Sequence, residues 1–194
     1  MTKVVCLTGG IGSGKTLIAN YFKSLGIPVY IADDEAKKLM KKTKIIQAIE
    51  AIFGKTIFEN DMINKEKLAS IVFNNPEKLK ALNQVIHPAV KKDFEDWLSK
   101  HKSLPLVVKE VAILFESGSN SFCDKIITVV APLEARIQRV LERDNTNREN
   151  ILARINNQWT DEQRISKSDF IIHNISVDEA KKEVDEILKL LKNQ

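Results

Sequence analysis

Short apolar runs alternate with segments of helical periodicity along the chain. Five of these runs predict buried strands, because each is largely apolar and is bounded by turn or cap signals. They cover residues 4–7, 27–31, 106–116, 125–130 and 169–172. Most intervening segments carry apolar residues at three- and four-residue steps, which predicts helices. The pattern therefore favours an α/β fold in which five parallel strands carry helices on both faces and are joined by right-handed crossovers.

The stretch from Ala36 to about Lys102 differs, because strand signals vanish and the remaining periodicity is helical. One apolar stripe continues past Pro88, and the pair His87-Pro88 predicts a helix break with Pro88 opening the next helix. So long a crossover predicts a helical insertion between the second and third strands, where a kinase-like fold could grip a second substrate. Its basic cluster is interpreted as a solvated face and consists of Lys37, Lys38, Lys41, Lys42 and Lys44.

The helix predicted after the fourth strand carries arginines on a single face, at positions i, i+3 and i+7. They are Arg136, Arg139 and Arg143, and Arg148 and Arg154 follow beyond a polar break. Arginines in a mobile helical hairpin could close over a transferring phosphate and neutralise its charge. The alternative is pairing with neighbouring acids, but too few acids lie on that face to pair all of them. We expect one or two of these arginines to be functional.

The composition of the 194-residue chain is that of an ordinary globular protein, with 43% hydrophobic and 29% charged residues. Its length suits one domain, with room for an inserted subdomain. The formal net charge of +4 is too small to indicate nucleic-acid binding by itself. A polyanionic small ligand would be served equally well.

Two absences favour a cytoplasmic protein. No apolar run approaches the length of a membrane span, and the first strand begins so early that no room is left for a signal peptide. The only two cysteines, Cys6 and Cys123, offer neither a metal-binding spacing nor a disulfide framework. Cys6 is expected to be a small core residue of the first strand. A reducing compartment is therefore the default expectation.

The strongest single signal follows the first predicted strand. Residues 7–16 read Leu-Thr-Gly-Gly-Ile-Gly-Ser-Gly-Lys-Thr and fit G-x-x-x-x-G-K-[ST], with Gly9, Gly14, Lys15 and Thr16 at the fixed positions. Glycines let backbone N–H groups approach phosphate oxygens, and the N-terminus of the next helix adds positive potential. Lys15 supplies a charge for the outer phosphates, and the Thr16 hydroxyl supplies a ligand for Mg²⁺. The loop thus predicts binding of a nucleoside triphosphate with Mg²⁺.

Acidic residues follow two of the predicted strands. Asp33 comes directly after the second strand, and Glu116 ends the third apolar run. Because the carboxyl ends of parallel strands line the ligand crevice, both acids are expected near the bound phosphates. Asp33 could deprotonate an attacking hydroxyl or hold Mg²⁺ through water, but it could equally cap the next helix. Glu116 could instead be a first-turn acid of a helix.

The phosphate-binding loop does not by itself separate kinases from GTPases, motor ATPases or transporters. The sequence contains neither Asn-Lys-x-Asp, which reads guanine in GTPases, nor the transporter signature Leu-Ser-Gly-Gly-Gln. The chain is also too short for a helicase with paired domains. Small size, a helical insertion and a late arginine-rich segment favour a small-molecule kinase.

Several spaced elements, taken together, resemble those of the bacterial dephospho-CoA kinase family, in the same order and over nearly the whole chain. The loop, its helix and residues 25–29 are similar to the family's opening. Asp33 falls where the family carries an Asp-Ala-Asp signature. The remaining elements are Leu82-Asn83 with Ile86-His87-Pro88, Leu114-Phe115-Glu116, Arg139, Arg143-Asp144, Arg154-Ile155 with Gln158, and Asp169 with Ile171-Ile172 and Asn174.

The chain departs from the family's pattern at several positions. Ile31 stands where the family usually has the first acid of Asp-Ala-Asp, so Asp33 would carry that role alone. The other departures are Ala112 in place of a proline, Arg164 in place of a common lysine, and Ser168 and His173 in the closing element.

The resemblance implies a P-loop kinase-like, three-layer fold in a single domain with three parts. They are a core (about 1–35, 103–135 and 165–194), a helical substrate-binding insertion (about 36–102) and a lid (about 136–164). The implied activity is ATP-dependent phosphorylation of the 3′-hydroxyl of the ribose of dephospho-CoA, with ATP as donor and Mg²⁺ as metal. The expected partners are these two small molecules, without nucleic acid or membrane, in a monomer or weak homo-oligomer. Another small-molecule kinase and a non-catalytic ATP-binding regulator are the alternatives.

The resemblance also assigns roles to individual residues. Asp33 is expected to be the general base, and Arg139 and Arg143 are expected to be the lid cations that act with Lys15. His87, Glu116 and Asp33 are expected to contact the acceptor, and Asn174 the adenine. The nucleotide is expected on Gly9, Gly10, Ile11, Gly12, Ser13, Gly14, Lys15 and Thr16, with Thr16 as the metal ligand.

Overall fold

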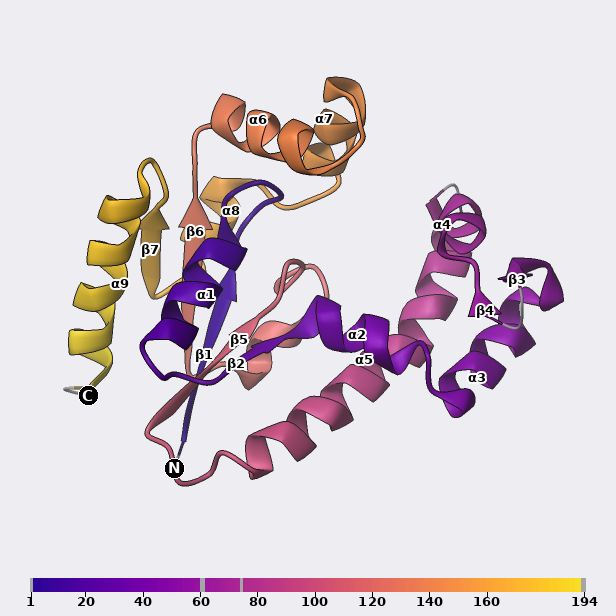
Figure 1. The fold of residues 1–194 in the computed structure, drawn as a ribbon, viewed down its shortest axis with the longest axis horizontal. Coiled ribbons are helices and arrows are strands. Elements are labelled where there is room, and N and C mark those ends of the chain that lie inside the picture. The colour runs from indigo at the N-terminus through magenta and orange to yellow at the C-terminus, as the bar shows by residue number, and fades with distance from the viewer. Residues whose placement is uncertain (1, 60–61, 74, 193–194) are drawn as a thin grey trace. The chain divides into compact units, whose positions relative to one another are not determined.

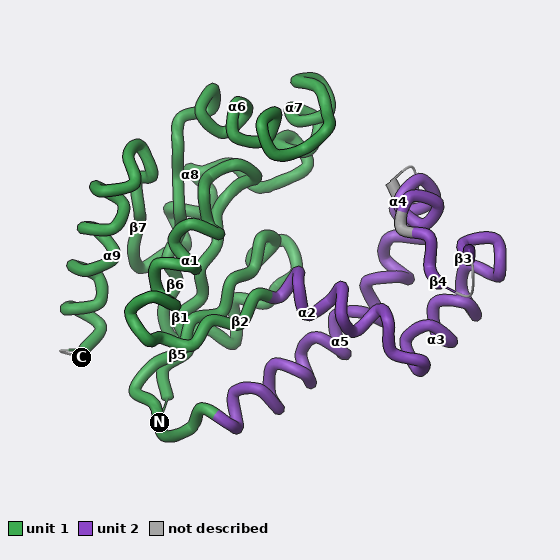
Figure 2. Tube along the Cα trace, in the orientation of Figure 1, with its two compact units in different colours: residues 1–31, 101–194 green, residues 32–100 purple. Residues whose placement is uncertain are grey.

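A computed structural model describes residues 2–59, 62–73 and 75–192. The chain forms two compact units, coloured differently in Figure 2. The first unit comprises residues 1–31 and 101–194 and holds a parallel sheet. The second unit comprises residues 32–100 and is mostly helical.

The sheet of the first unit consists of five strands in the order β2-β5-β1-β6-β7, and every pair is parallel (Figure 1). The five-stranded parallel sheet expected from the apolar runs is thereby confirmed. The central strand β1 lies between β5 and β6, with Val5 opposite both Val108 and Lys125. The strands are β1 (Lys3–Thr8), β2 (Val29–Ile31), β5 (Leu106–Glu110), β6 (Lys125–Val130) and β7 (Phe170–His173).

Strand β5 is shorter than its apolar run predicted. It ends at Glu110, and residues 112–118 form turns rather than a continuation toward Glu116. Leu114 and Phe115 are nevertheless buried. A continuous apolar run marks buried chain, and periodicity alone does not separate a buried turn from a buried strand. The expectation that Glu116 ends the strand is therefore wrong.

Helices α1 (Lys15–Ser24) and α9 (Val177–Lys192) pack on one face of this sheet and on each other. The core there contains Val5, Leu7, Val108, Ile127 and Val129 from the strands, Ile18, Ala19 and Phe22 from α1, and Ala180, Val184, Ile187, Leu188 and Leu191 from α9. Successive side chains of a strand point to opposite faces, so Thr128 points away from this core. Its hydroxyl lies 2.7 Å from the hydroxyl of Ser168, three residues after the end of α8 (Asp161–Ile165). Helix α8 therefore covers the other face.

Helix α1 ends as the sequence predicted, with Gly26 as the residue beyond its C-cap. Gly26 has φ 77° and donates its N–H to Lys23 O, while Ile27 donates to Phe22 O. This pair of bonds satisfies carbonyl groups that the helix end would leave without partners. The chain is thereby turned from α1 into β2.

Two further helices of the first unit follow β6. They are α6 (Leu133–Arg143) and α7 (Arg148–Asn156), and both lie in the segment expected to form a lid. Ile137, Val140 and Ile151 form the buried centre of a hydrophobic cluster between them, called here the lid cluster. Thr160 and Gln163 form a reciprocal capping box at the start of α8.

Cys6 of β1 and Cys123 are joined by a disulfide, which the sequence reasoning did not expect. Cys123 lies between the short 3-10 helix η2 (Ser119–Phe122) and β6, and the pairing of β6 with β1 brings the two cysteines together. Their Cα atoms are 5.6 Å apart, within the usual range for a disulfide. Because 117 positions separate them, cysteine spacing alone does not indicate the pairing.

The second unit contains α2 (Ala32–Leu39), α3 (Thr43–Phe53), the 3-10 helix η1 (Lys55–Ile57), α4 (Lys65–Phe73) and α5 (Pro76–Ser99). It also contains an antiparallel hairpin of two-residue strands, β3 (Phe58–Glu59) and β4 (Met62–Ile63), where no strand was expected. Its core contains Ile49, Ile57, Leu68 and Ile86. Strands this short carry too few residues for an alternating pattern to stand out.

The helix break predicted at His87-Pro88 is wrong, because α5 continues through Pro88 without interruption. A proline inside a helix removes a hydrogen bond and costs about 3 kcal/mol. Here Ile86 is buried and Val90 packs against the same core, on either side of Pro88. Burial of a large aliphatic side chain contributes about 1.5–3 kcal/mol, so packing offsets the local preference. Among the described helices, α5 included, none is long and apolar enough to cross a membrane.

Candidate active site

The loop between β1 and α1 adopts a conformation that specifically requires glycine. Gly12 and Gly14 have φ of 76° and 96°, a region that other residues rarely adopt. A Cβ at Gly12 would collide with the carbonyl oxygen of Arg136, and a Cβ at Gly14 would collide with Nδ2 of Asn174. Two later segments of the chain therefore lie directly against the loop. The sequence motif is thus realised as a tight turn between a central strand and a helix.

The N-terminus of α1 faces the end of this loop. Gly14 is the N-cap, and the first helical N–H groups have no acceptor within the helix, so they form a site of positive potential. Lys15 Nζ donates to Gly9 O at 2.8 Å and Gly10 O at 3.2 Å. The ammonium group thus already lies over the loop. The Thr16 side chain is exposed in the first turn of the helix. This arrangement suits the phosphates of a nucleotide.

Asn174 supports the loop from the end of β7. Asn174 is 3% exposed. Its side-chain Nδ2 donates to Ser13 O at 2.8 Å, and its backbone N–H donates to Val130 O, also at 2.8 Å. Ser13 Oγ is buried without a hydrogen-bond partner among the described residues. An unsatisfied hydroxyl inside a glycine loop is consistent with a site built for a polar ligand.

The lid arginines occupy different environments. Arg139 donates from Nη2 to Asn174 O at 3.0 Å and from Nη1 to Gly12 O and Ser13 O, both at 3.4 Å. The Arg143 side chain is 61% exposed and pairs with Asp144 at 2.8 Å. Of the two expected lid cations, the structure brings Arg139 against the loop and pairs Arg143 with its sequence neighbour. Arg136, on the same helix face, is buried and also contacts the loop.

Glu116 lies in the turns after β5 and is held by the lid segment. Its Oε1 accepts from Arg164 Nη2 at 3.2 Å and from the backbone N of Trp159 at 3.0 Å. Arg164 is fully buried, and its Nη1 also contacts Asp161 Oδ1 at 3.3 Å. Glu116 is therefore part of a charge network, and a contact with the acceptor stays a prediction.

Asp33 and His87, the other expected acceptor contacts, belong to the second unit. Asp33 is exposed in the first turn of α2, where a negative charge also stabilises the helix N-terminus. His87 lies on α5, and desolvation lowers its pKa below the ordinary histidine value. His87 and Pro88 line a hollow of about 530 Å³ on this unit. The roles of both residues stay predictions.

A buried acid that the sequence reasoning missed lies beside the loop's own strand. Glu110 is 6% exposed at the carboxyl end of β5, opposite Leu7 of β1 in the strand register. Leu7 is only two residues before Gly9, where the glycine loop begins. The signal was an acid at the end of an apolar run, but it was hidden because the run was taken to continue to Glu116.

Metal binding by protein groups alone has no support. Among the residues that the structure describes, no group of three or more histidine, cysteine or acidic side chains could hold a metal ion. A magnesium ion bound with a nucleotide needs fewer protein ligands, because phosphate oxygens and water fill most of its positions. Thr16, in the first turn of α1, and Glu110, at the carboxyl end of β5, are oxygen-bearing side chains of this unit.

The sequence matches the model of one protein family, dephospho-CoA kinase, over residues 3–179. A dephospho-CoA kinase of Fusobacterium nucleatum is 40% identical over 174 residues, covering 89% of this chain and 90% of the relative. A dephospho-CoA kinase of Bacteroides fragilis is 37% identical over 186 residues, covering 95% and 89%.

Solved structures agree with this match. One from Thermus thermophilus has a TM-score of 0.90 at 30% identity and covers 97% of each chain. A dephospho-CoA kinase from Campylobacter jejuni has a TM-score of 0.65 at 25% identity, covering 98% of this chain and 97% of its own. A shikimate kinase from Acinetobacter baumannii, at 16% identity and a TM-score of 0.57, shares the fold. With its glycine loop, parallel sheet and family match, the chain belongs to the dephospho-CoA kinase family.

Proposed function

We propose that the chain transfers the γ-phosphoryl group of ATP to the 3′-hydroxyl of the ribose of dephospho-CoA, which yields coenzyme A and ADP. It is a phosphotransferase that acts on an alcohol and completes coenzyme A biosynthesis. The single observation that carries this proposal is the glycine loop with Lys15, lying between β1 and α1 in a chain of this family. Membership in a kinase family implies ATP as the donor.

The loop binds the β- and γ-phosphates through backbone N–H groups, together with the N-terminus of α1. Lys15 exchanges its bonds to the carbonyls of Gly9 and Gly10 for bonds to phosphate oxygens. Arg139 lies close enough to the loop to offset charge on the transferring group, and Arg143 reaches it when the lid closes. Asn174 positions the adenine at the end of β7.

The Thr16 hydroxyl and the Glu110 carboxylate would hold Mg²⁺, the latter through water. When bound, the metal would supply positive charge to offset the negative charge of the phosphate oxygens. Glu110 stands on the strand next to β1, at the level of the loop, and its burial keeps it in place. Thr16 stands in the first turn of α1.

Asp33 acts as the general base. Its carboxylate takes the proton of the ribose 3′-hydroxyl as that oxygen bonds to the γ-phosphorus, and the bond from the γ-phosphorus to the β–γ bridging oxygen breaks to release ADP. His87 and Glu116 contact the acceptor. Desolvation lowers the pKa of His87, which favours the neutral imidazole, and a neutral imidazole can accept a hydrogen bond.

The remaining expectations belong to the same proposal. The partners are the two small molecules, without nucleic acid or membrane. The protein works in the cytoplasm as a monomer or weak homo-oligomer. Analytical ultracentrifugation at micromolar concentration should show a monomer or weak self-association, and a stable dimer would contradict this last statement.

The test is a coupled assay of ADP release with purified protein, ATP and Mg²⁺. Dephospho-CoA, adenosine and shikimate are offered as acceptors, and the expected turnover occurs with dephospho-CoA. Turnover of another acceptor alone would reassign the substrate. Retained ATP binding with no transfer to any acceptor would support a non-catalytic regulator instead. Lys15→Ala is the loop control and should lose both ATP affinity and rate.

A further inference from the structure

Both peptide groups that flank Ile11 are held by residues of the lid segment. The Ile11 N–H donates to Gln158 Oε1 at 2.9 Å, and the Ile11 carbonyl accepts from Arg136 Nε at 2.9 Å. The Ile11 side chain also packs on the lid cluster. Ile11 is therefore the point at which the phosphate-binding loop is attached to the lid segment, through backbone and side chain together.

Arg136 is a fixed part of this attachment. Its side chain is 7% exposed, and Nη1 contacts Asp161 Oδ2 at 3.1 Å. Its guanidinium lies so close to Gly10 that a Cβ there would overlap Nη2. An arginine enclosed in this way keeps its place when a substrate enters. Arg136 therefore braces the loop, in contrast to the exposed Arg143.

Asp161 connects this brace to the rest of the unit. One carboxylate oxygen accepts from Arg136, and the other accepts from the fully buried Arg164 at 3.3 Å. Arg164 in turn contacts Glu116 at 3.2 Å. Two buried cations thus share one carboxylate, and each has a further acceptor. Such a network holds its members in one geometry, since loss of one acceptor leaves a buried charge poorly compensated.

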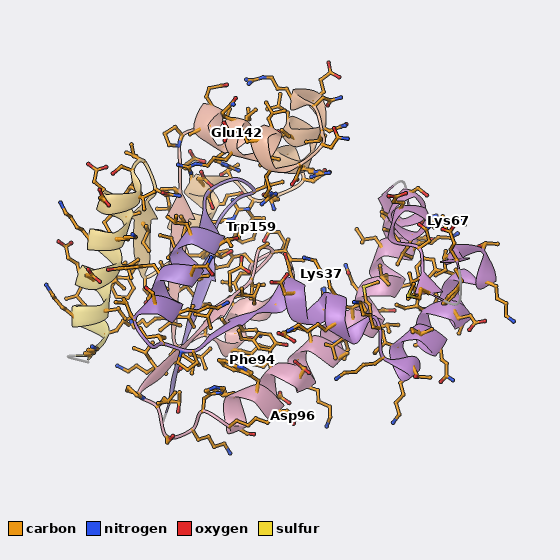
Figure 3. The ribbon with its side chains drawn as sticks, viewed as in Figure 1. Lys37, Lys67, Phe94, Asp96, Glu142 and Trp159 are labelled. Carbon is orange, nitrogen blue, oxygen red and sulfur yellow. A yellow bond between two sulfur atoms is a disulfide. The ribbon has the colours of Figure 1, made fainter. Side chains whose placement is uncertain are left out.

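Gln158 lies in the short connection between α7 and α8, and this connection is held by Glu116, a member of the same charge network. The next residue, Trp159, donates its backbone N–H to Glu116 Oε1 at 3.0 Å, and its ring stacks on Phe115 with centroids 5.1 Å apart. Figure 3 labels Trp159 between the helices of the lid segment and the sheet. Gln158 also donates its own backbone N–H to Ile155 O at 3.0 Å. The amide that meets Ile11 is therefore placed by neighbours on both sides.

We propose that Gln158 is a positioning residue for nucleotide binding: together with Arg136 it sets the orientation of the Ile11 backbone, and through it the shape of the phosphate-binding loop. Gln158 acts through the loop and touches no substrate. The assignment rests on the function proposed above, because it gives the loop an ATP to bind. It also makes the lid segment a determinant of ATP affinity before the lid closes.

Replacing Gln158 with leucine keeps the size of the side chain and removes the acceptor. The Ile11 N–H then loses its partner, and the loop samples other orientations. Because loop N–H groups bind phosphate in both ground and transition states, KM for ATP should rise roughly tenfold while kcat stays within about threefold. A role confined to folding would instead lower the active fraction, hence kcat, and leave KM unchanged.

The experiment compares Gln158→Leu with Gln138→Leu, a matched control. Gln138 lies on α6, is exposed, and donates from its side-chain amide to Glu142 Oε1 at 2.9 Å. Steady-state kinetics with ATP and dephospho-CoA give the KM and kcat of each protein. ATP affinity by calorimetry without acceptor separates this proposal from the proposed function, because it needs no phosphoryl transfer. Affinity in Gln158→Leu within twofold of wild type would overturn the positioning role.

Amide hydrogen exchange at Ile11 provides a second readout on folded protein. Without nucleotide, the Ile11 amide should exchange slowly in wild type and at least tenfold faster in Gln158→Leu. Gln158→Glu keeps an acceptor oxygen at the same place, so protection of Ile11 should return in that variant. Equal exchange in wild type and Gln158→Leu, or no recovery in Gln158→Glu, would refute the proposal.

Discussion

The side-chain amide of Asn174 donates a 2.8 Å hydrogen bond to the carbonyl oxygen of Ser13, although 161 positions separate the two residues. The contact joins the end of β7 to the phosphate-binding loop at the N-terminus of α1. It also leaves no room for a side chain at Gly14, since a Cβ at that position would collide with the same amide nitrogen. The loop is therefore shaped by a residue from the far end of the sheet.

Asn174→Ala should weaken ATP binding roughly tenfold and destabilise the protein by about 1–3 kcal/mol, because the Ser13 carbonyl loses its 2.8 Å bond and keeps only the 3.4 Å contact with Arg139. Calorimetry and denaturant unfolding measure the two effects. Gly14→Ala should also weaken ATP binding, and adding Asn174→Ala to it should not restore the binding, since φ at position 14 remains 96°. Full recovery in the double variant would mean that crowding alone, and not backbone conformation, requires glycine there.

Arg139→Met and Arg143→Met should differ in which constant they change. Arg139 already lies against the loop, so its loss should raise KM for ATP and lower kcat. Arg143 is exposed, and under the proposed mechanism it acts only when the lid closes, so its loss should lower kcat by up to about a thousandfold with KM nearly unchanged. Arg148→Met, on the same segment and paired with Glu134, serves as the control. A wild-type kcat in Arg143→Met would remove that residue from the mechanism.

Asp33→Asn should keep ATP affinity and lose turnover by a factor of about 10²–10⁴, because an amide cannot accept the proton of the ribose hydroxyl. Asp34→Asn is a neighbouring control, since Asp34 pairs with Lys37 at the surface. Calorimetry gives the affinity and the coupled assay gives the rate. Normal turnover of Asp33→Asn would leave the reaction without its assigned base.

Reduction of the Cys6–Cys123 disulfide should lower the free energy of unfolding by about 2–5 kcal/mol, because the bond restrains the unfolded chain. Guanidinium unfolding curves with and without dithiothreitol measure the change. Cys123→Ser should give one curve under both conditions. Identical curves for wild type would show that the bond contributes nothing in solution, as a reducing cytoplasm would favour.

Pro88→Ala should stabilise the second unit by up to about 3 kcal/mol, since it restores a helical hydrogen bond to α5 and removes the proline ring. Urea unfolding followed by circular dichroism measures the gain. A loss of stability would mean that the proline itself packs in a way that alanine does not replace.

Sequence reasoning succeeded where local pattern decides the structure. The strands, the end of α1 at Gly26 and the glycine loop are each specified by a few consecutive residues. It failed at Pro88 because packing of the second unit outweighed a local preference, and at the third strand because apolar runs also occur in buried turns. These two failures share one cause, which is that burial is a property of the folded chain.

The long-range part of the candidate site was beyond sequence reasoning for a different reason. Glu110, Gln158 and Asp161 acquire their roles from residues more than a hundred positions away or from a network of several charges. The resemblance placed Gln158 in a pattern but gave it no task. Only the contact with the Ile11 backbone indicates one.

The central place of β1 has a mechanical consequence. A strand with a full ladder on each side comes apart only when both ladders do, so the stem of the nucleotide loop should be among the last segments to melt. We therefore expect the proposed anchor for the triphosphate to keep its form when outer parts of the first unit move.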